Sequence, residues 1–151
     1  MSITASGFYG LTLEKYLKST ASVDLESDTD VKCGMVTDTY TPAFDTHDFY
    51  DDITNEVTGT GYTAGGKAIT STELTVGSPA AGQIKYDAAD VEWTGSTISD
   101  AMAAFLYGEV GASSADELIF LSDFVTAAST TSGTFTIQWH SDGIFYFDYT
   151  P

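Results

Sequence analysis

The sequence predicts an all-β fold of mainly antiparallel strands, a β-sandwich or small barrel, with one short N-terminal helix. The first observation is the alternation from Thr134 to Trp139, which places Phe135, Ile137 and Trp139 on one face. The second is a succession of roughly seven to nine short strand-like segments, with turn signals about every 8–12 residues. The third is the absence of an internal repeat or a linker, which favours one continuous unit.

The length of 151 residues fits one domain, and a chain of this size buries roughly 68–70% of its unfolded surface. We expect an N-terminal arm and helix over residues 1–30 and a single antiparallel β domain over residues 31–151. Cys33 is the only cysteine, so the chain cannot form an internal disulfide. Because Cys33 lies in an apolar run, we predict a small buried core residue rather than a nucleophile.

A helix is predicted over residues 8–19, because the apolar residues there recur at helical spacing. The apolar stripe consists of Tyr9, Leu13, Tyr16 and Leu17. Such a helix packs on the sheet of its own chain or on a neighbouring subunit, and the first arrangement is the simpler expectation.

The acidic segment 24–30 follows as a polar connector. Its alternating acids suggest calcium ligands, but the glycine and the glutamate that an EF-hand loop requires are missing. We therefore expect a solvated loop. A strand is predicted over residues 31–37, and an irregular segment with at most one helical turn over residues 41–53.

The glycine-rich stretch 58–67 lacks a phosphate-loop pattern, so its glycines are expected to serve β-bulges or a close approach between the backbones of two chains. Further strands are predicted at 68–76, 83–93 and 118–125, and the second of these contains the turn-prone segment 87–90. The length and alanines of 101–108 favour a helix, but the regular strand spacing around it favours a strand, which is the prediction adopted. Loops or turns are predicted at 77–82, 96–99, 109–117 and 126–133. The chain is expected to end in a hairpin that pairs 134–139 with 144–149 through a type I′ turn at Asp142 and Gly143.

The charge balance restricts the possible partners. Twenty-two acidic residues face five lysines, there is no arginine, and the net charge is −17. Phosphate backbones and anionic lipids require a basic patch, so we expect no nucleic-acid partner and no membrane anchor. No apolar run approaches the length of a transmembrane helix, and the first residues lack the pattern of a secretory signal. We therefore expect synthesis in a cytoplasm.

One cluster has the residue types of a chemical site. His47 lies among four aspartates, and its spacing to Asp51 allows the two side chains to share a face. Hard-cation sites do not favour histidine, so we interpret His47 as structural rather than as a metal ligand. The other members of the cluster are Asp45, Asp48 and Asp52.

The remaining inventory contains no pattern of an enzyme. There is no Gly-x-Ser-x-Gly elbow, no His-Glu-x-x-His, no Cys-x-x-Cys and no dinucleotide fingerprint. His140 is expected to be a turn residue beside the predicted hairpin turn. We therefore predict no catalytic residues, no cofactor-binding residues, no metal ligands and no enzymatic activity. The nine Tyr, nine Phe and two Trp exceed what one small core needs, so some are expected at subunit contacts.

Five segments together resemble a known family. They are DVKCGMV (30–36), THDFYDDI (46–53), GTGYTAGGK (59–67), YDAADVEW (86–93) and GTFTIQW (133–139). This succession is similar to small virion-associated proteins of tailed bacteriophages, and the similarity extends from about Ser6 to Phe147. Cys33, Gly34 and Met35 stand where relatives show Ala-Leu, a departure that concerns packing. The shared motifs are turn, bulge and core residues and carry no chemistry of their own.

The resemblance implies a structural virion protein. The leading expectation is a capsid decoration (cement) protein that is made in the host cytoplasm and sits on the capsid exterior. Its partners would be the major capsid protein and further copies of itself, most simply a trimer, and it would bridge capsomers. The alternative is a tail, neck or fibre component, possibly a host-glycan-binding module that uses aromatic residues such as Trp139 or Tyr149. An enzyme acting on host glycan is the weakest of these interpretations.

Overall fold

The computed structural model describes residues 3–150 and confirms the predicted fold class, with 47% of the chain in strands and a single short α-helix. The strands of this part are β1 (Gly7–Phe8), β2 (Val31–Thr37), β3 (Gly59–Thr60), β4 (Lys67–Ala68), β5 (Glu73–Val76), β6 (Gln83–Asp87), β7 (Val91–Gly108), β8 (Leu118–Ile137) and β9 (Phe145–Asp148). The helices are α1 (Gly10–Leu17) and a short 3-10 helix, η1 (Tyr50–Asp52).

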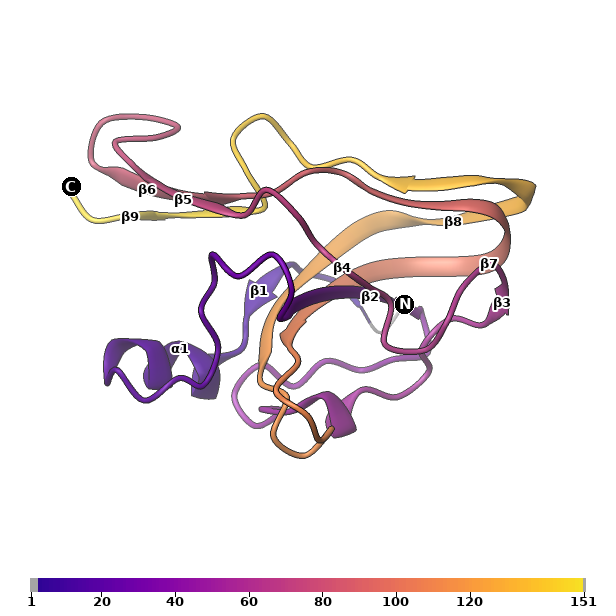
Figure 1. The fold of residues 1–151 in the computed structure, drawn as a ribbon, viewed down its shortest axis with the longest axis horizontal. Coiled ribbons are helices and arrows are strands. Elements are labelled where there is room, and N and C mark those ends of the chain that lie inside the picture. Colours follow the sequence, from indigo (N-terminus) through magenta and orange to yellow (C-terminus); the bar gives the residue numbers. More distant parts are fainter. Residues whose placement is uncertain (1–2, 151) are drawn as a thin grey trace.

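Strands β7 and β8 form one long antiparallel pair that organises the molecule. They are 18 and 20 residues long, and several register shifts interrupt their pairing. β-bulges bend and twist a strand, and Asp100 and Val125 both have positive φ in the central part of the pair. The pair therefore curls over, so that its two halves form separate layers (Figure 1).

Two predictions fail at this curl. The turn predicted at 96–99 and the loop predicted at 126–133 both lie inside strands, because Ser96 pairs with Gly133 and Ile98 with Thr130. The small polar residues of these segments have low strand propensity, but the long-range pairing overrides that local preference. The neighbouring predictions are confirmed: 101–108 and 118–125 are strands, and the intervening 109–117 is a loop.

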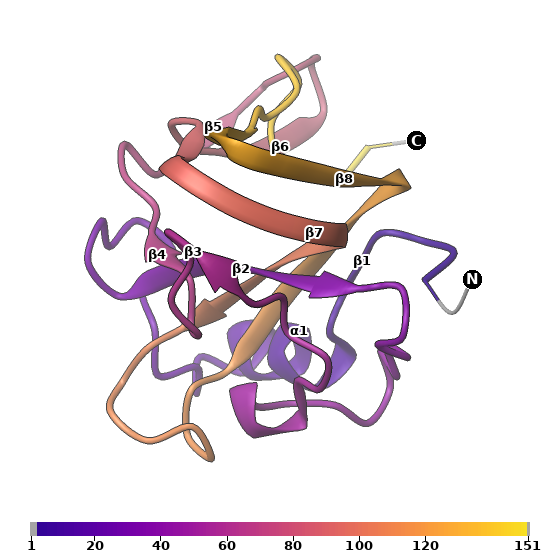
Figure 2. The same cartoon turned by 90° about the vertical axis from the view of Figure 1, so that its right-hand side faces the viewer.

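The larger sheet has the order β1-β8-β7-β2-β4, with β3 also paired to β7. Its strands β8, β7 and β2 lie side by side in Figure 2. The strand predicted at 31–37 is confirmed as β2. Segment 41–53 is irregular and contains one 3-10 turn, as expected. The N-terminal arm adds β1 to the edge of this sheet, where Gly7 pairs with Leu121.

The glycine-rich stretch allows the backbone to approach neighbouring strands closely. A Cβ atom at Gly66 would lie 1.9 Å from the carbonyl oxygen of Cys33, and one at Gly59 would lie 2.0 Å from that of Thr97. Both glycines have positive φ. The two glycines therefore bring the backbone of this stretch close to β2 and β7 of the same chain.

The smaller sheet has the order β5-β6-β9. The loop predicted at 77–82 is confirmed, since it joins β5 to β6. The single strand predicted at 68–76 is instead divided into β4 and β5 by a bend in which Ser71 has φ of 56°. The segment predicted at 83–93 is divided at its turn-prone part, because β6 ends at Asp87 and β7 begins at Val91 in the other sheet.

The predicted C-terminal hairpin is wrong. A turn is present, in which the Gly143 N–H donates to the His140 carbonyl at 2.8 Å, and only Gly143 of the two predicted turn residues has positive φ. A type I′ turn requires positive φ at both central residues, so this turn is not of that type. The two segments that flank it diverge instead of pairing with each other. Residues 134–137 belong to β8 and pair with β7, whereas β9 pairs with β6. Tertiary pairing again overrides the local signal.

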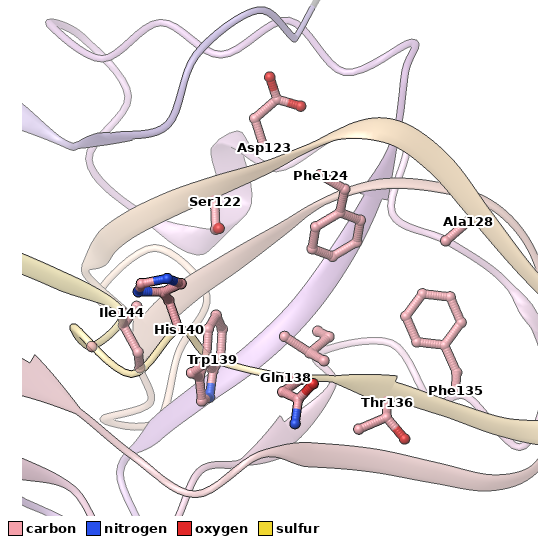
Figure 3. A pocket seen from close by; sticks show the side chains of 12 residues that line it. Ser122, Asp123, Phe124, Ala128, Phe135, Thr136, Gln138, Trp139, His140 and Ile144 are labelled. Carbon is pink, nitrogen blue, oxygen red and sulfur yellow. The ribbon is translucent and has the colours of Figure 1, made fainter.

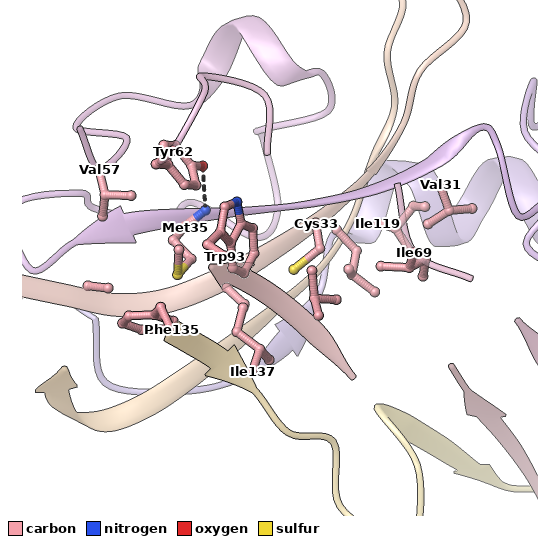
Figure 4. Packing of buried hydrophobic residues seen from close by; sticks show 14 of the residues in the cluster. Val31, Cys33, Met35, Val57, Tyr62, Ile69, Trp93, Ile119, Phe135 and Ile137 are labelled. Atoms are coloured by element: carbon pink, nitrogen blue, oxygen red, sulfur yellow. Dashed lines mark hydrogen bonds between the residues drawn. The ribbon is translucent and has the colours of Figure 1, made fainter. Parts of the chain in front are cut away.

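The main core lies between the two layers of the curled pair and extends to the smaller sheet. Figure 4 shows Trp93, Phe135 and Ile137 from one layer opposite Cys33 and Met35 of β2. Cys33 is fully buried, as predicted, and burial raises the pKa of its thiol. The sequence predicts that Phe135, Ile137 and Trp139 share one face, and this is also confirmed. Phe135 and Ile137 are buried in this core, and the partly buried Trp139 packs against it.

A second core covers the opposite face of the larger sheet. Its buried residues include Tyr9 of the arm and Tyr40, with Phe44, Tyr50 and Ile53 of the irregular segment packed against them. The helix predicted over 8–19 is present but shorter, over Gly10–Leu17. It lies against its own chain, near the end of the molecule that carries the smaller sheet (Figure 1).

Candidate functional site

An open apolar groove lies between α1 and the smaller sheet. Its volume is about 490 Å³. It is lined entirely by apolar and aromatic residues: Phe8, Leu13, Tyr16, Leu17, Leu25, Leu74, Ile84, Phe145 and Phe147. Six parts of the chain contribute these residues, namely β1, α1, the acidic connector, β5, β6 and β9, so the groove is a product of the tertiary fold.

The register of the smaller sheet explains the shape of the groove. Leu74, Tyr86 and Phe145 are paired across the three strands and form an inner row, which belongs to the core. Two residues further along, Val76, Ile84 and Phe147 form an outer row on the same face, because side chains alternate along a strand. The inner row completes the core, whereas the outer row faces the groove and solvent.

The outer part of the groove is exposed. Leu17, on the last turn of α1, is 79% exposed, Val76 is 70% exposed and Phe147 is 39% exposed. Contiguous exposed apolar side chains of this kind mark interaction sites more often than isolated ones do. This group, comprising the groove residues and Val76, is called the apolar groove below.

The acidic connector forms part of the groove wall. The Oδ1 atom of Asp28 accepts hydrogen bonds from the N–H and the hydroxyl of Thr72, both at 2.9 Å, and Glu26 accepts one from the N–H of Leu74 at 3.1 Å. The backbone hydrogen bond from Thr72 is the main reason why the pKa of Asp28 is lowered. These carboxylates attach the connector to β5 and place Leu25, which lies between them in the chain, in the groove wall.

A buried ion pair holds α1 in position. The Lys15 Nζ lies 3.3 Å from Glu117 Oε1, and the Ser22 N–H donates to Glu117 Oε2 at 3.1 Å. Glu117 is almost completely buried, whereas Lys15 retains some exposure. The Lys15 ammonium also lies 4.2 Å from the ring centroid of Phe49. The helix side of the groove is therefore fixed to the larger sheet.

A second cavity lies at the open edge of the curled β8 and has a volume of about 360 Å³. In Figure 3, Phe124 and Phe135 come from opposite arms of β8, and Trp139, His140 and Ile144 belong to the segment that leaves it. The Ser122 hydroxyl points toward the interior and the Asp123 carboxylate points away from it. This cavity is called the aromatic pocket below.

The residues of the predicted cluster around His47 make structural contacts, and the contact of His47 is with a tyrosine. The His47 Nδ1 lies 2.9 Å from the Tyr40 hydroxyl, which lies 3.0 Å from the Tyr9 hydroxyl. Asp52 Oδ2 accepts from the backbone N–H of Asp48 at 2.9 Å, and burial is the largest cause of the raised pKa of Asp48. Residues 3–150 contain no group of three or more His, Cys, Asp or Glu side chains arranged to hold a metal ion.

The other residues named from the sequence lie apart from one another. His140 is exposed at the turn, and its Nδ1 accepts from the Asp142 N–H at 3.1 Å, in agreement with its prediction as a turn residue. Tyr149 is exposed beyond β9, and of the two aromatic residues proposed for a glycan site only Trp139 lines the aromatic pocket.

Sequence reasoning missed the carboxylate of Glu56. It accepts hydrogen bonds from the Tyr50 hydroxyl at 2.7 Å, the Tyr62 hydroxyl at 2.6 Å and the Gly65 N–H at 2.7 Å. It therefore ties the irregular segment to the glycine-rich stretch. Sequence reasoning also missed the groove, although an apolar helix residue at Leu17 and the alternation of Leu74 and Val76 were visible signals.

The fold and its two surfaces thus define a small all-β protein with one apolar groove, one aromatic pocket and an acidic charge. Comparison with protein-family models, with curated proteins and with solved structures gives no match to this chain. Across the described residues, none of the helices is long and apolar enough to cross a membrane.

Proposed function

We propose that this protein is a structural component of a tailed-phage virion, specifically a capsid decoration protein that binds the outer shell and bridges capsomers. The family resemblance of five sequence segments is the starting point. The observation in the structure that carries the proposal is the apolar groove, because a protein that acts by binding needs a surface whose burial stabilises the complex. Residues 3–150 offer no arrangement that points to catalysis instead.

The charges favour a partner with basic residues. Lys15, Lys18, Lys32 and Lys85 each pair with a carboxylate. The fifth lysine, Lys67, donates to the backbone carbonyl of Glu92 at 2.8 Å. The acidic residues far outnumber these lysines, so the surface around the groove repels anions and attracts cations. We therefore assign the groove to an apolar segment of the major capsid protein that is flanked by basic residues.

Multiple copies would strengthen such binding. A single groove of this size buries less surface than a standard stable interface, so one contact alone would be weak. A homo-oligomer, most simply a trimer, engages several equivalent shell sites at once and gains affinity without new contacts. Bridging between capsomers then resists the pressure of packaged DNA.

Rebinding of purified protein to heads that lack it tests the groove. Leu17→Asp adds a carboxylate to the groove, and because Leu17 is 79% exposed the substitution leaves folding intact. Burying that charge in an apolar contact is costly, so we expect the bound copies at a fixed protein concentration to fall at least about tenfold. Co-sedimentation with the heads measures the bound protein.

Val125→Asp is the matched control, since Val125 is 71% exposed on β8 and lies outside the groove. It changes the net charge by the same amount and should bind as the unsubstituted protein does. Equal binding of both variants would exclude the groove as the contact, and no binding of the unsubstituted protein would reject the capsid assignment. In the alternative assignment to the tail, neck or fibre, the protein would bind purified tails and not heads.

A further inference from the structure

We propose that the aromatic pocket is a binding site for a neutral saccharide unit. This inference does not depend on the role of the apolar groove or on a place in a virion. The pocket volume of about 360 Å³ lies at the small end of the range for ligand sites, which suits one or two sugar rings. Aromatic walls, polar groups beside them and the lack of an unpaired charge inside are the features that fit such a ligand.

The first observation is that Trp139 is fixed in place on the pocket wall. Its indole Nε1–H donates to the Ala89 carbonyl at 3.2 Å, and its backbone N–H donates to Asp90 Oδ1 at 3.0 Å. Both hydrogen bonds attach the residue to the segment between β6 and β7, while the ring lines the cavity (Figure 3). A rigid aromatic ring on a cavity wall is a preorganised platform, because little side-chain entropy is lost when a ligand stacks on it.

The second observation is a pair of further aromatic rings. Phe124 and Phe135 come from opposite arms of β8 and line the same cavity (Figure 3). The C–H groups of a sugar ring form apolar patches that pack on aromatic faces, whereas its hydroxyls remain at the rim of the ring. Three aromatic residues around one cavity therefore match the apolar part of a saccharide.

The third observation is that polar groups beside these rings are free to bind hydroxyls. The Ser122 hydroxyl points into the pocket (Figure 3), and it has no hydrogen-bond partner within residues 3–150. The His140 Nδ1 lies 3.1 Å from the Asp142 backbone nitrogen and 3.4 Å from Asp142 Oδ2. The other ring nitrogen, Nε2, has no hydrogen-bond partner within residues 3–150, and it donates to or accepts from a hydroxyl according to the tautomer. Hydroxyls both donate and accept, so they match this combination of groups.

The backbone of β8 adds further polar groups. Strand β1 pairs with β8 only at Phe120 and Leu121, so beyond Leu121 no described strand covers the outer edge of β8. Some of these backbone groups already have partners, since the Asp123 N–H donates to Ser6 Oγ at 2.9 Å. The remaining groups of this outer edge are not paired with a strand of residues 3–150.

The charges specify that the ligand is neutral. No lysine lines the pocket, and a net charge of −17 repels phosphates and carboxylates. Among the described residues around the pocket the carboxylate is that of Asp123, which points away from the interior and accepts from the Val125 N–H at 2.8 Å. Among the described lining residues His140 is the one side chain that can carry a positive charge, and it lies 3.4 Å from the Asp142 carboxylate, so the pocket offers no unpaired cation to an anionic ligand.

The test uses the complete folded protein and a panel of neutral hexoses, N-acetylhexosamines and their disaccharides. Chemical-shift changes in ¹H–¹⁵N spectra locate binding, and titration gives the dissociation constant, which for a single ring should be roughly millimolar. We expect shifts concentrated at Ser122, Phe124, Trp139 and His140. Trp139→Ala should weaken binding at least about tenfold, as is typical for a central aromatic contact.

Two further variants keep the test informative if Trp139→Ala unfolds the protein. His140→Ala removes a hydrogen-bonding ring from an exposed turn, so folding is retained and weaker binding is expected. Tyr149→Ala removes an exposed aromatic residue outside the pocket and should bind as the unsubstituted protein does. The proposal is rejected if no sugar of the panel causes shifts at the pocket, if His140→Ala binds normally, or if Tyr149→Ala weakens binding equally.

Discussion

The ion pair between Lys15 and Glu117 offers the sharpest test of how α1 is held on the sheet. Lys15→Met removes the ammonium but keeps an unbranched apolar stem of similar length, so packing over Phe49 is largely retained. The substitution leaves the carboxylate of Glu117 buried, and within residues 3–150 the Ser22 N–H is its one remaining hydrogen-bond donor. The cost is therefore that of an uncompensated buried charge.

The burial of Lys15 and Glu117 determines how much the free energy of unfolding falls in the Lys15→Met variant. Removing one member of a fully buried pair costs about 3–5 kcal/mol. The Lys15 side chain is 27% exposed, so water reaches part of the vacated space, and we expect about 2–3 kcal/mol. Domains of this size are stable by about 5–15 kcal/mol, so the loss is a large fraction of the total. Unfolding in urea, followed by circular dichroism, measures it as a lower midpoint at unchanged slope.

Two further variants separate the buried charge from other effects. Lys15→Met combined with Glu117→Gln removes both charges while the glutamine oxygen still accepts from Ser22, so the double variant should be more stable than Lys15→Met alone. Lys18→Met breaks an exposed pair with Glu14 on the same helix and should change the midpoint little. A Lys15→Met protein as stable as the unsubstituted one, or strictly additive effects in the double variant, would refute this reasoning.

Three other predictions concern single positions. Gly66→Ala forces a Cβ atom against the Cys33 carbonyl and should prevent folding or cost more than about 3 kcal/mol, whereas Gly95→Ala, which also has positive φ but open space around it, should cost about 1 kcal/mol in urea unfolding. Because folding lowers the pKa of Asp28, its contribution to stability is present above the unfolded pKa and is lost as pH falls through the folded pKa. Asp28→Asn should therefore lose less stability than the unsubstituted protein between about pH 5 and pH 2, measured by urea midpoints. The Cys33 thiol, buried and with a raised pKa, should react with a thiol reagent only in urea, and rapid reaction of the native protein would contradict its placement.

The sequence was a good guide where local pattern and tertiary role agree. Residues 31–37 form a strand buried for most of its length, and their apolar run predicts it directly. The loop at 77–82 contains the turn residues that a hairpin connection needs, and it joins β5 to β6 as predicted. In both places the local composition already contains the information that the fold uses.

The failures have a common physical cause. Segments 96–99 and 126–133 are rich in small polar residues, which locally favour turns, but in the fold they pair with each other across the curl of β7 and β8. At the C-terminus the Asp142-Gly143 signal does give a turn, yet the two flanking segments pair with β7 and β6 in different sheets. Pairing over long sequence distances decides these regions, and a periodicity argument does not include it.

The sequence predicts that the protein has aromatic and apolar interaction surfaces, but it does not predict which residues come together to form them. The excess of aromatic residues predicts an interaction surface, and Trp139 is one of the two aromatic residues that the sequence suggests for a sugar site. The groove, however, combines α1, the acidic connector and the outer row of the smaller sheet, and the aromatic pocket exists only because β8 curls. Neither juxtaposition follows from spacing along the chain.

The central claim is a place on the phage capsid, and gold-labelled antibody on intact, purified phage particles tests it most directly. Electron microscopy of the labelled particles shows where the protein is located. We predict dense label over the head, in keeping with many copies bound to the outer shell. Label confined to the tail or neck, or particles without label, would contradict the assignment as a decoration protein.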